Sequence, residues 1–461
     1  MGPFDPWGQL DEDPEESGRS LFETVSPDPS PTSAHLHVPT FDWNEDQLRA
    51  VDQILSWRCA PSAPRYYKLT GPAGTGKTAV TREIRRRLAG TRTSWAAMTG
   101  KATLCLRRAL GVSARTFHSA LYHSPREVDN VPEARIDLVF DKVKGGFADD
   151  LLLVVDEAIM ISPRLREDCE HSPYQKVLLI GDPYQIPPVL SRAEESAARG
   201  EDYSVFSGIP GPYLRQIMRN GGAVLRAATE VREQQVIPKW SEENAAGSYA
   251  FSSFGSPEAA ILRAVEDRLD DREDHAVITW RNDVRLRVNA EVRRRLGHLS
   301  NTPEPGEPLV VRRNIHRKGL MNGDIVRVEE ILEEGPQLAG VPTRWFRVRE
   351  ESSGRVMRLL SPSQDFTGTL PYVGLEVWKR ACQAARVDSV CPLTYAYALT
   401  CHSAQGSQYR RVTVLVPRDL RNPHFAKSTR LPDGVTMIFA MRWLYTAIAR
   451  ASERASLLFA E

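Results

Sequence analysis

At 461 residues the chain exceeds the size of one ordinary domain, and we expect about two to four modules. Its composition, with 41% hydrophobic and 26% charged residues, is that of a globular protein, and no apolar run approaches the ~20 residues that a membrane helix needs. A net charge of +1 at pH 7 says little about partners until it is divided along the chain.

The first 39 residues form an acidic, proline-rich tail. They hold seven prolines, eight acids and a single base, Arg19, with too few apolar residues to offset the entropy lost on folding. We therefore expect disorder over residues 1–39. The tail carries −7 and so leaves +8 on the rest of the chain, the sign expected of a body that binds a phosphate backbone. Such a tail could compete with DNA for a basic cleft, or it could be a solvated extension without a function.

An export signal is not expected, because acidic residues stand where a signal peptide would be basic and then apolar. The six cysteines contain no C-x-x-C pair, which argues against a zinc ribbon, an iron–sulfur cluster or a disulfide framework. We therefore expect reduced cysteines and a cytoplasmic location.

Beyond the tail, short aliphatic runs alternate with helical patterns, which is typical of parallel βαβ units and predicts an α/β fold. Residues 66–70 predict a strand, and Val80, Ile84 and Leu88 mark one face of the helix that follows. Further buried strands are expected at residues 151–156, 177–182, 276–280, 412–416 and 456–460. Short alternating stretches at 301–390 predict a small β-rich insertion.

A phosphate-binding loop follows the first predicted strand. Residues 71–78, GPAGTGKT, match G-x-x-x-x-G-K-[ST], in which glycines let backbone N–H groups approach phosphates at a helix N-terminus. The ammonium of Lys77 would lie near the β- and γ-phosphates, and the hydroxyl of Thr78 would bind Mg²⁺. The predicted nucleotide ligands in this loop are Gly71, Gly74, Thr75, Gly76, Lys77 and Thr78.

Two carboxylates, Asp156 and Glu157, lie at the end of the strand predicted at 151–156. Asp156 would act on Mg²⁺ through water, and Glu157 would polarise the attacking water as general base; a helix cap is the alternative. The strand at 177–182 leads into a proline-braced loop that presents Gln185. This amide would sense the γ-phosphate, whereas taken alone it would be a solvated loop residue.

The order of these motifs resembles that of superfamily 1 helicases, and within them the RecD/Dda-like branch, superfamily 1B. NEDQLRAV is similar to the Q motif and implies that Gln47 contacts the adenine. DEAIM, GDPYQIPPV, TWRNDVRLRVN and LMNGDIVRV resemble further segments of the branch in the expected order. The resemblance covers residues from about 40 to 461. It implies two RecA-like P-loop NTPase motor domains with parallel sheets, and an SH3-like β-rich insertion in the second.

The resemblance also implies domain boundaries. The first motor domain is expected over residues 40–192, with a short, polar pin insertion at about 122–149. The second is expected over 193–300 and 391–461, and the β-rich insertion over 301–390.

Segments similar to the DNA-contacting motifs of this branch supply predicted DNA contacts. MTGKA resembles PTGRA, and RTFHS resembles the adjoining TIH segment, which implies contacts from Thr99, Gly100 and His118. YALTCHSAQGSQ is similar to motif V, which implies contacts from Thr400 and His402.

Two arginines are expected to reach the nucleotide from the second motor domain. LYTAIARA closely resembles motif VI and makes Arg450 the candidate arginine finger, which would stabilise charge on the transferring phosphoryl group. LRQIMRN resembles motif IV, whose arginine maps to Arg219, with Arg215 as the alternative register. Exposed surface arginines are the alternative for both. The motif V turn implies a nucleotide contact from Gly406.

The resemblance implies an ATP-dependent DNA helicase that moves 5′ to 3′ on single-stranded DNA, with ATP and Mg²⁺ as cofactors. The expected partners are single-stranded DNA and junctions with duplex; a single-strand binding protein and replication proteins are further candidates. We expect a monomer in bacterial or phage-infected cytosol, without a membrane partner, in replication, repair or recombination. Bases would stack on aromatics such as Trp280 or Phe117, with core packing as the alternative.

Three other functions remain open at this point. The first is a single-stranded DNA translocase that displaces proteins but unwinds weakly, which the short pin region would permit. The second is an RNA-directed motor of the same superfamily, because the motor motifs barely distinguish the two polymers. The third is a small-molecule kinase, which would have a phosphate-binding loop but no use for Gln185 or Arg450.

Overall fold

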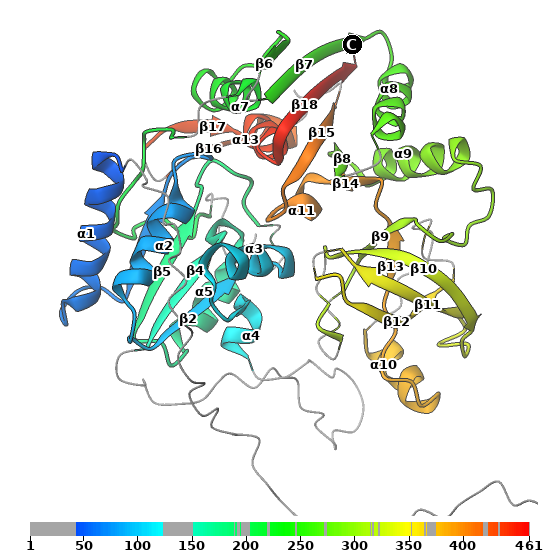
Figure 1. Ribbon diagram of the computed structural model, residues 1–461, viewed down its shortest axis with the longest axis horizontal. Helices are drawn as coiled ribbons and strands as arrows, with labels where there is room; N and C mark the ends of the chain where they lie inside the picture. Colours follow the sequence, from blue (N-terminus) through cyan, green and yellow to red (C-terminus); the bar gives the residue numbers. More distant parts are fainter. Residues whose placement is uncertain are drawn as a thin grey trace, which may run out of the picture. The chain divides into compact units, whose positions relative to one another are not determined.

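The computed structural model describes residues 43–122, 151–188, 203–218, 222–244, 247–271, 274–313, 323–351, 353–363, 375–417, 423–431 and 434–460, with isolated positions at 190, 194, 315, 318–320 and 366. The tail predicted at 1–39 and nearly all of the pin insertion predicted at about 122–149 lie outside these residues. Figure 1 labels the helices and strands. No helix in the described part of the chain is long and apolar enough to cross a membrane.

Five strands form an all-parallel sheet in the order β1-β5-β4-β2-β3. They are β1 (Tyr66–Thr70), β2 (Thr93–Ala97), β3 (Ala114–Thr116), β4 (Leu152–Asp156) and β5 (Lys176–Gly181). The accompanying helices are α1 (Glu45–Cys59), α2 (Lys77–Arg87), α3 (Gly100–Leu110), α4 (Phe117–Leu121), η1 (Ala158–Met160) and α5 (Pro163–Glu170). We call this sheet with its helices the first lobe. Strand β5 is buried along its whole length, because helices cover both faces of such a sheet.

Six strands form the second sheet, in the order β14-β8-β15-β18-β7-β6. They are β6 (Glu242–Asn244), β7 (Gly247–Phe254), β8 (His275–Thr279), β14 (Ala398–Thr400), β15 (Tyr409–Val416) and β18 (Ala451–Ala460). All pairs are parallel except β6 with β7 at the edge. The predicted α/β class with two parallel sheets is therefore confirmed.

The second sheet, with its helices and a small hairpin, forms the second lobe. The helices are α7 (Ala223–Gln234), α8 (Pro257–Asp270), α9 (Asn282–Arg295), α11 (Cys401–Ala404), α12 (Pro423–Ala426) and α13 (Phe439–Ile448), and the hairpin is β16 (Ser428–Arg430) with β17 (Thr436–Ile438). Helix α13 is buried from Ala440 to Ile448 and carries Trp443 at 0% exposure, so it lies inside the core of this lobe.

A third, antiparallel sheet separates α9 from β14 in the chain (Figure 1). Its strands are β9 (Pro308–Val311), β10 (Ile325–Glu334), β11 (Thr343–Glu350), β12 (Val356–Pro362) and β13 (Leu393–Tyr395), in the order β12-β11-β10-β9-β13, and α10 (Leu375–Ala384) precedes β13. The alternating stretches in the sequence form β10 and β11. Strand β13 lies beyond residue 390, the expected end of the insertion. The SH3-like arrangement stays a prediction.

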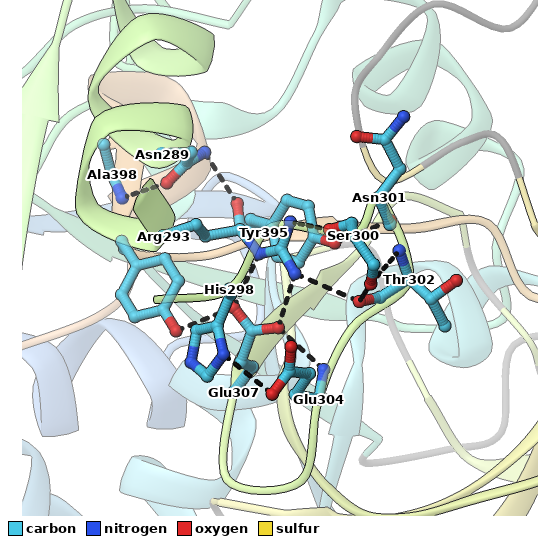
Figure 2. A network of polar contacts seen from close by, with 11 residues as sticks. Asn289, Arg293, His298, Ser300, Asn301, Thr302, Glu304, Glu307, Tyr395 and Ala398 are labelled. Atoms are coloured by element: carbon cyan, nitrogen blue, oxygen red, sulfur yellow. Dashed lines mark hydrogen bonds and ion pairs between the residues drawn. The ribbon is translucent and has the colours of Figure 1, made fainter. Parts of the chain in front are cut away.

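A buried ion pair joins α9 to this antiparallel sheet (Figure 2). Arg293 donates through Nε and Nη2 to the two carboxylate oxygens of Glu307 at 2.8 and 3.1 Å, and the two side chains are 7% and 1% exposed. The Tyr397 hydroxyl donates to the same carboxylate at 2.9 Å, and the Arg293 guanidinium lies 4.2 Å from the centroid of the Tyr395 ring. Glu307 precedes β9 and Tyr395 ends β13, so the cluster fixes both chain connections between the sheet and the second lobe.

Glu307→Ala is expected to lower the free energy of unfolding by about 3–5 kcal/mol, because the charge of Arg293 would stay buried without its partner. Chemical denaturation measures the loss. Glu334→Ala is the matched control, since Glu334 pairs with Arg344 at 2.7 Å but is 80% exposed; it should cost less than about 1 kcal/mol. Losses of equal size in the two variants would contradict a special role for the buried pair.

Candidate active site

The segment 71–78 forms a loop between β1 and α2. Gly74 and Gly76 have φ angles of 82° and 84°, in the left-handed region that glycine adopts without strain. Lys77 begins α2, and its ammonium donates to the carbonyls of Gly71 and Pro72 at 2.7 and 2.8 Å. The ammonium therefore lies within the loop, where phosphate oxygens could replace these carbonyls as its partners.

Gln47 supports the loop from α1. Its Nε2 donates to the Thr75 carbonyl at 3.1 Å, and a Cβ added to Gly76 would lie 2.4 Å from the same nitrogen. Gln47 also forms a capping box with Asn44, in which each side chain accepts the backbone N–H of the other. The predicted adenine contact of Gln47 stays a prediction; its described contacts hold the loop and start the helix.

The two predicted carboxylates lie at the end of β4. Asp156 ends the strand, and its Oδ1 accepts the Glu157 N–H at 2.9 Å. Burial and the neighbouring Glu157 carboxylate raise the pKa of Asp156 to about 6, against the opposing charge of Lys77. Glu157 has a φ of 52°, an uncommon conformation for a residue other than glycine.

The chemistry of the side chains fits Mg²⁺ shared with a nucleotide. Thr78 is exposed in the first turn of α2, and Asp156 lies at the end of β4. A hydroxyl and a carboxylate are hard oxygen ligands, and Mg²⁺ in nucleotide sites takes one or two such protein groups beside phosphate oxygens. Bound Mg²⁺ would lower the pKa of Asp156 again, because a cation favours the charged carboxylate.

Arg450 reaches the first lobe from the second. It follows α13 and is 5% exposed. Its Nε donates to the Thr446 carbonyl and its Nη1 to the Ser407 carbonyl, each at 3.3 Å, and Nη1 lies 3.9 Å from Glu157 Oε1. The structure thus brings Glu157 and Arg450 together, although 293 positions separate them in the sequence.

Tyr445 is a residue of this site that the sequence patterns did not single out. Its hydroxyl donates to Asp182 and accepts the Ala73 N–H at 2.9 Å, which joins α13 to two loops of the first lobe. Burial and the Asp182 carboxylate raise the pKa of Tyr445 well above its usual value, so the hydroxyl keeps its proton. The available signal was its place in LYTAIARA, where only Arg450 received a role.

The second predicted arginine, Arg219, lies outside the described residues. Arg215, the arginine of the alternative register, is exposed, and its backbone N–H donates to Asp46 Oδ2 at 3.4 Å. The neighbouring Met218 N–H donates to the Gly74 carbonyl at 3.0 Å. The segment before Arg219 therefore runs beside the phosphate-binding loop.

A T-x-H-S sequence occurs once in each lobe and forms the same turn. Thr116 caps α4 directly after β3, and Thr400 caps α11 directly after β14; each hydroxyl accepts the N–H of the serine three residues on. His118 and His402 are the second residues of these helices. Both histidines, predicted to lie at DNA, thus occupy equivalent positions in the two lobes.

The other residues predicted to lie at DNA surround the start of α3. Thr99 caps this helix by accepting the Ala102 N–H at 3.1 Å, and Gly100 is its first residue. Gly406 has a φ of 72°, and a Cβ added to it would lie 2.7 Å from Thr99 Oγ1. Gly406 therefore lies beside a predicted DNA contact, although the motif implied a nucleotide contact for it.

The two aromatic stacking candidates differ in burial. Phe117 has 0% exposure, and the Trp280 ring lies 4.5 Å from the Phe425 ring, centroid to centroid. Core packing, the alternative given for both, describes Phe117. Trp280 is half-buried and its ring also lies 6.3 Å from that of His402, so a stacking role for Trp280 stays a prediction.

Comparison with known proteins adds independent findings. A family model described as an AAA domain matches residues 42–244. The ATP-dependent DNA helicase dda of Enterobacteria phage T4 is 24% identical over 311 residues, which is 65% of this chain and 67% of that protein. A structure of two coordinating Pif1 helicases, concerning unwinding at forked dsDNA, is similar with a TM-score of 0.52 at 18% identity, and the match covers 90% of this chain and 92% of that one. The structure of Pif1 helicase from Bacteroides in complex with ADP-AlF3 and ssDNA has a TM-score of 0.49 at 17% identity. That match covers 90% of this chain and 92% of the other.

Proposed function

We propose that the chain is an ATP-dependent DNA helicase of the Dda- and Pif1-like type, superfamily 1B, which moves 5′ to 3′ along single-stranded DNA; its similarity to the phage T4 helicase and the fold that it shares with Pif1 helicases support this. One observation supports this above the others: Arg450 of the second lobe lies 3.9 Å from Glu157 of the first. A phosphoryl group held between them would favour approach of the lobes, and its hydrolysis and release would favour separation.

For the chemical step, we assign five roles around the phosphates. The loop amides and Lys77 hold the β- and γ-phosphates, Glu157 takes a proton from the attacking water, and Gln185 orients that water. Arg450 stabilises the charge that develops on the transferring group, and Arg219 is a second candidate for this role. Thr78 and Asp156 would hold Mg²⁺, which supplies charge neutralisation at the phosphate oxygens.

DNA would contact both lobes, at the two equivalent turns and at the start of α3. The first lobe offers Thr99, Gly100 and His118, and the second offers Thr400 and His402. Contacts of this kind to the backbone carry no sequence information, so we expect binding that is independent of base sequence. Lobes that approach and separate while each holds the backbone would move the protein along the strand.

We further propose that residues 40–192 form one motor domain, that 193–300 and 391–461 form the other, and that 301–390 form the insertion. We infer a monomer that acts in the cytosol of a bacterial or phage-infected cell, where ATP and DNA are both available. Single-strand binding protein and replication proteins are the proposed further partners.

Strand separation of a partial duplex with a 5′ single-stranded DNA tail is expected in the presence of ATP and Mg²⁺. A duplex with a 3′ tail should remain intact, and Lys77→Ala should abolish separation, because Lys77 holds the phosphates. A gel or fluorescence assay on both substrates, each in a DNA and an RNA version, measures this.

Every other outcome would reject part of the proposal or indicate a different activity. Separation of the 3′-tailed substrate alone would reject the proposed direction. DNA-stimulated ATP hydrolysis without strand separation would indicate the translocase, and a preference for RNA tails would indicate the RNA-directed motor. Failure of Lys77→Ala to change ATP hydrolysis would reject the nucleotide site itself.

A further inference from the structure

Residues 182–186, which we call the sensor loop, follow β5 of the first lobe but pack in the second. Tyr184 and Ile186 are 6% and 0% exposed and belong to the same hydrophobic cluster as Trp443 of α13. The Arg232 guanidinium of α7 lies 5.5 Å from the centroid of the Tyr184 ring. The loop is therefore connected to one lobe by the chain and to the other by its side chains.

Arg442 of α13 holds the main chain of this loop at Gln185. Its Nε and Nη2 donate to the Gln185 carbonyl at 3.1 and 2.6 Å, and Nη2 also donates to the Pro183 carbonyl at 3.1 Å. Arg442 is 1% exposed, so these bonds form away from water, where a hydrogen bond to a charged donor is strong.

Two further side chains of the second lobe hold the next residue. The Ile186 N–H donates to Thr446 Oγ1 at 3.0 Å, and Gln405 Nε2 donates to the Ile186 carbonyl at 2.9 Å. Arg442 and Thr446 are one turn apart on α13, and Arg450, one further turn on, donates through Nε to the Thr446 carbonyl. One segment therefore carries both the contacts to the sensor loop and the candidate arginine finger.

The side chain of Gln185 has an acceptor oxygen that forms no hydrogen bond with the described residues. It is 5% exposed, and its Oε1 has no hydrogen-bond partner in the described part of the chain. A buried acceptor of this kind calls for a donor, and an attacking water is a suitable one. The main chain of Gln185 is thus held while its side-chain oxygen is available.

From these contacts we propose that Arg442 is a positioning residue for ATP hydrolysis, which holds Gln185 so that the γ-phosphate sensor moves with the second lobe. The inference rests on the proposed function. Because α13 and the segment after it carry both the sensor-loop contacts and Arg450, one movement of the second lobe brings sensor and arginine finger to the phosphate together. Hydrolysis is then restricted to the arrangement in which the lobes have met.

A double-mutant cycle tests this coupling. Arg442→Met and Gln185→Ala are each expected to reduce kcat for ATP hydrolysis by about 10²-fold at saturating single-stranded DNA, with KM for ATP changed by less than about threefold. The double variant should lose no more than the worse of the two single variants, because Arg442 acts through Gln185. Arg442→Lys should recover part of kcat, since an ammonium can still donate to these carbonyls.

Arg268→Met is the matched control. Arg268 is also buried, at 5% exposure, but it donates to the Asp271 carbonyl in another part of the second lobe. Its loss should lower the unfolding temperature and leave kcat of the folded protein within about twofold of the wild-type value, because Arg268 lies neither at the contact between the lobes nor at the sensor loop. Thermal unfolding of every variant shows that each assay is made on folded protein. If Arg442→Met does not fold, Arg442→Lys replaces it in the double-mutant cycle.

Losses that multiply in the double variant, or wild-type kcat in a folded Arg442 variant, would overturn the inference. With either result, wild-type ATP hydrolysis that disappears in Lys77→Ala would leave the proposed function standing. Absence of Lys77-dependent hydrolysis in the wild-type protein would reject the proposed function and this inference with it.

Discussion

Replacing Arg450 with alanine is expected to reduce kcat for ATP hydrolysis by about 10³- to 10⁵-fold, the range typical of arginine fingers. Arg450 approaches Glu157 from the other lobe, and apart from this contact its guanidinium donates to main-chain carbonyls. Its removal therefore takes a positive charge from the transition state and leaves the phosphate-binding loop intact. Steady-state hydrolysis with saturating single-stranded DNA measures the loss, and binding of ADP should change by less than about threefold.

Two variants control for charge and for general damage to the fold. Arg450→Lys keeps the charge but loses the planar fork of donors, so it should recover only part of kcat. Arg454→Ala removes an arginine that pairs with Glu243 at 3.0 Å at the edge of the second sheet, and it should leave hydrolysis unchanged. Wild-type kcat in Arg450→Ala would remove this residue from the catalytic site and would favour Arg219.

Glu157→Gln is expected to reduce kcat by about 10²- to 10⁴-fold, the usual contribution of a general base, while nucleotide binding persists. Glutamine has the size of glutamate and places no new demand on the φ of 52° at this position, but it cannot accept the proton of the attacking water. The variant should therefore bind ATP and DNA without separating strands. Binding of a fluorescent ATP analogue, measured beside hydrolysis, distinguishes the two steps.

Glu167→Gln is the matched control for this substitution, because Glu167 is an exposed carboxylate on α5 of the same lobe. It should behave as wild type in both measurements. If Glu157→Gln hydrolysed ATP at the wild-type rate, another group would have to serve as the base, and the proposed division of roles between Asp156 and Glu157 would be wrong.

The strands around the nucleotide site could be predicted from the sequence, because parallel strands covered on both faces are continuous apolar runs. The prediction for β1 agrees with the structure at both ends, that for β4 differs by one residue at its start, and that for β5 is shifted by one residue at both ends. Strands β2 and β3 were missed. The first, TSWAA, ends in two alanines, and the second has three residues, so both depend on pairing with neighbours more than on their own propensity.

The site was predictable to the extent that its residues belong to local motifs. Asp156 ends a strand, Glu157 follows it directly, and Lys77 follows β1 after the phosphate-binding loop. A strand end with a polar residue is visible in the sequence alone. The contact of Arg442 with Gln185 joins positions 257 residues apart, and no local pattern reports such a pairing. Tyr445 was missed for the same reason, since its partners lie in loops far away in the chain.

The position of β18 has a consequence for the order in which the protein acquires structure during its synthesis. All five strands of the first sheet lie within residues 66–181, so they can pair early on the ribosome. In the second sheet β18 lies between β15 and β7, yet it comprises residues 451–460 and emerges after both. Until then β7 has its central neighbour missing, and its edge is open to wrong partners. The nascent second lobe is thus the part of the chain that would most need a chaperone.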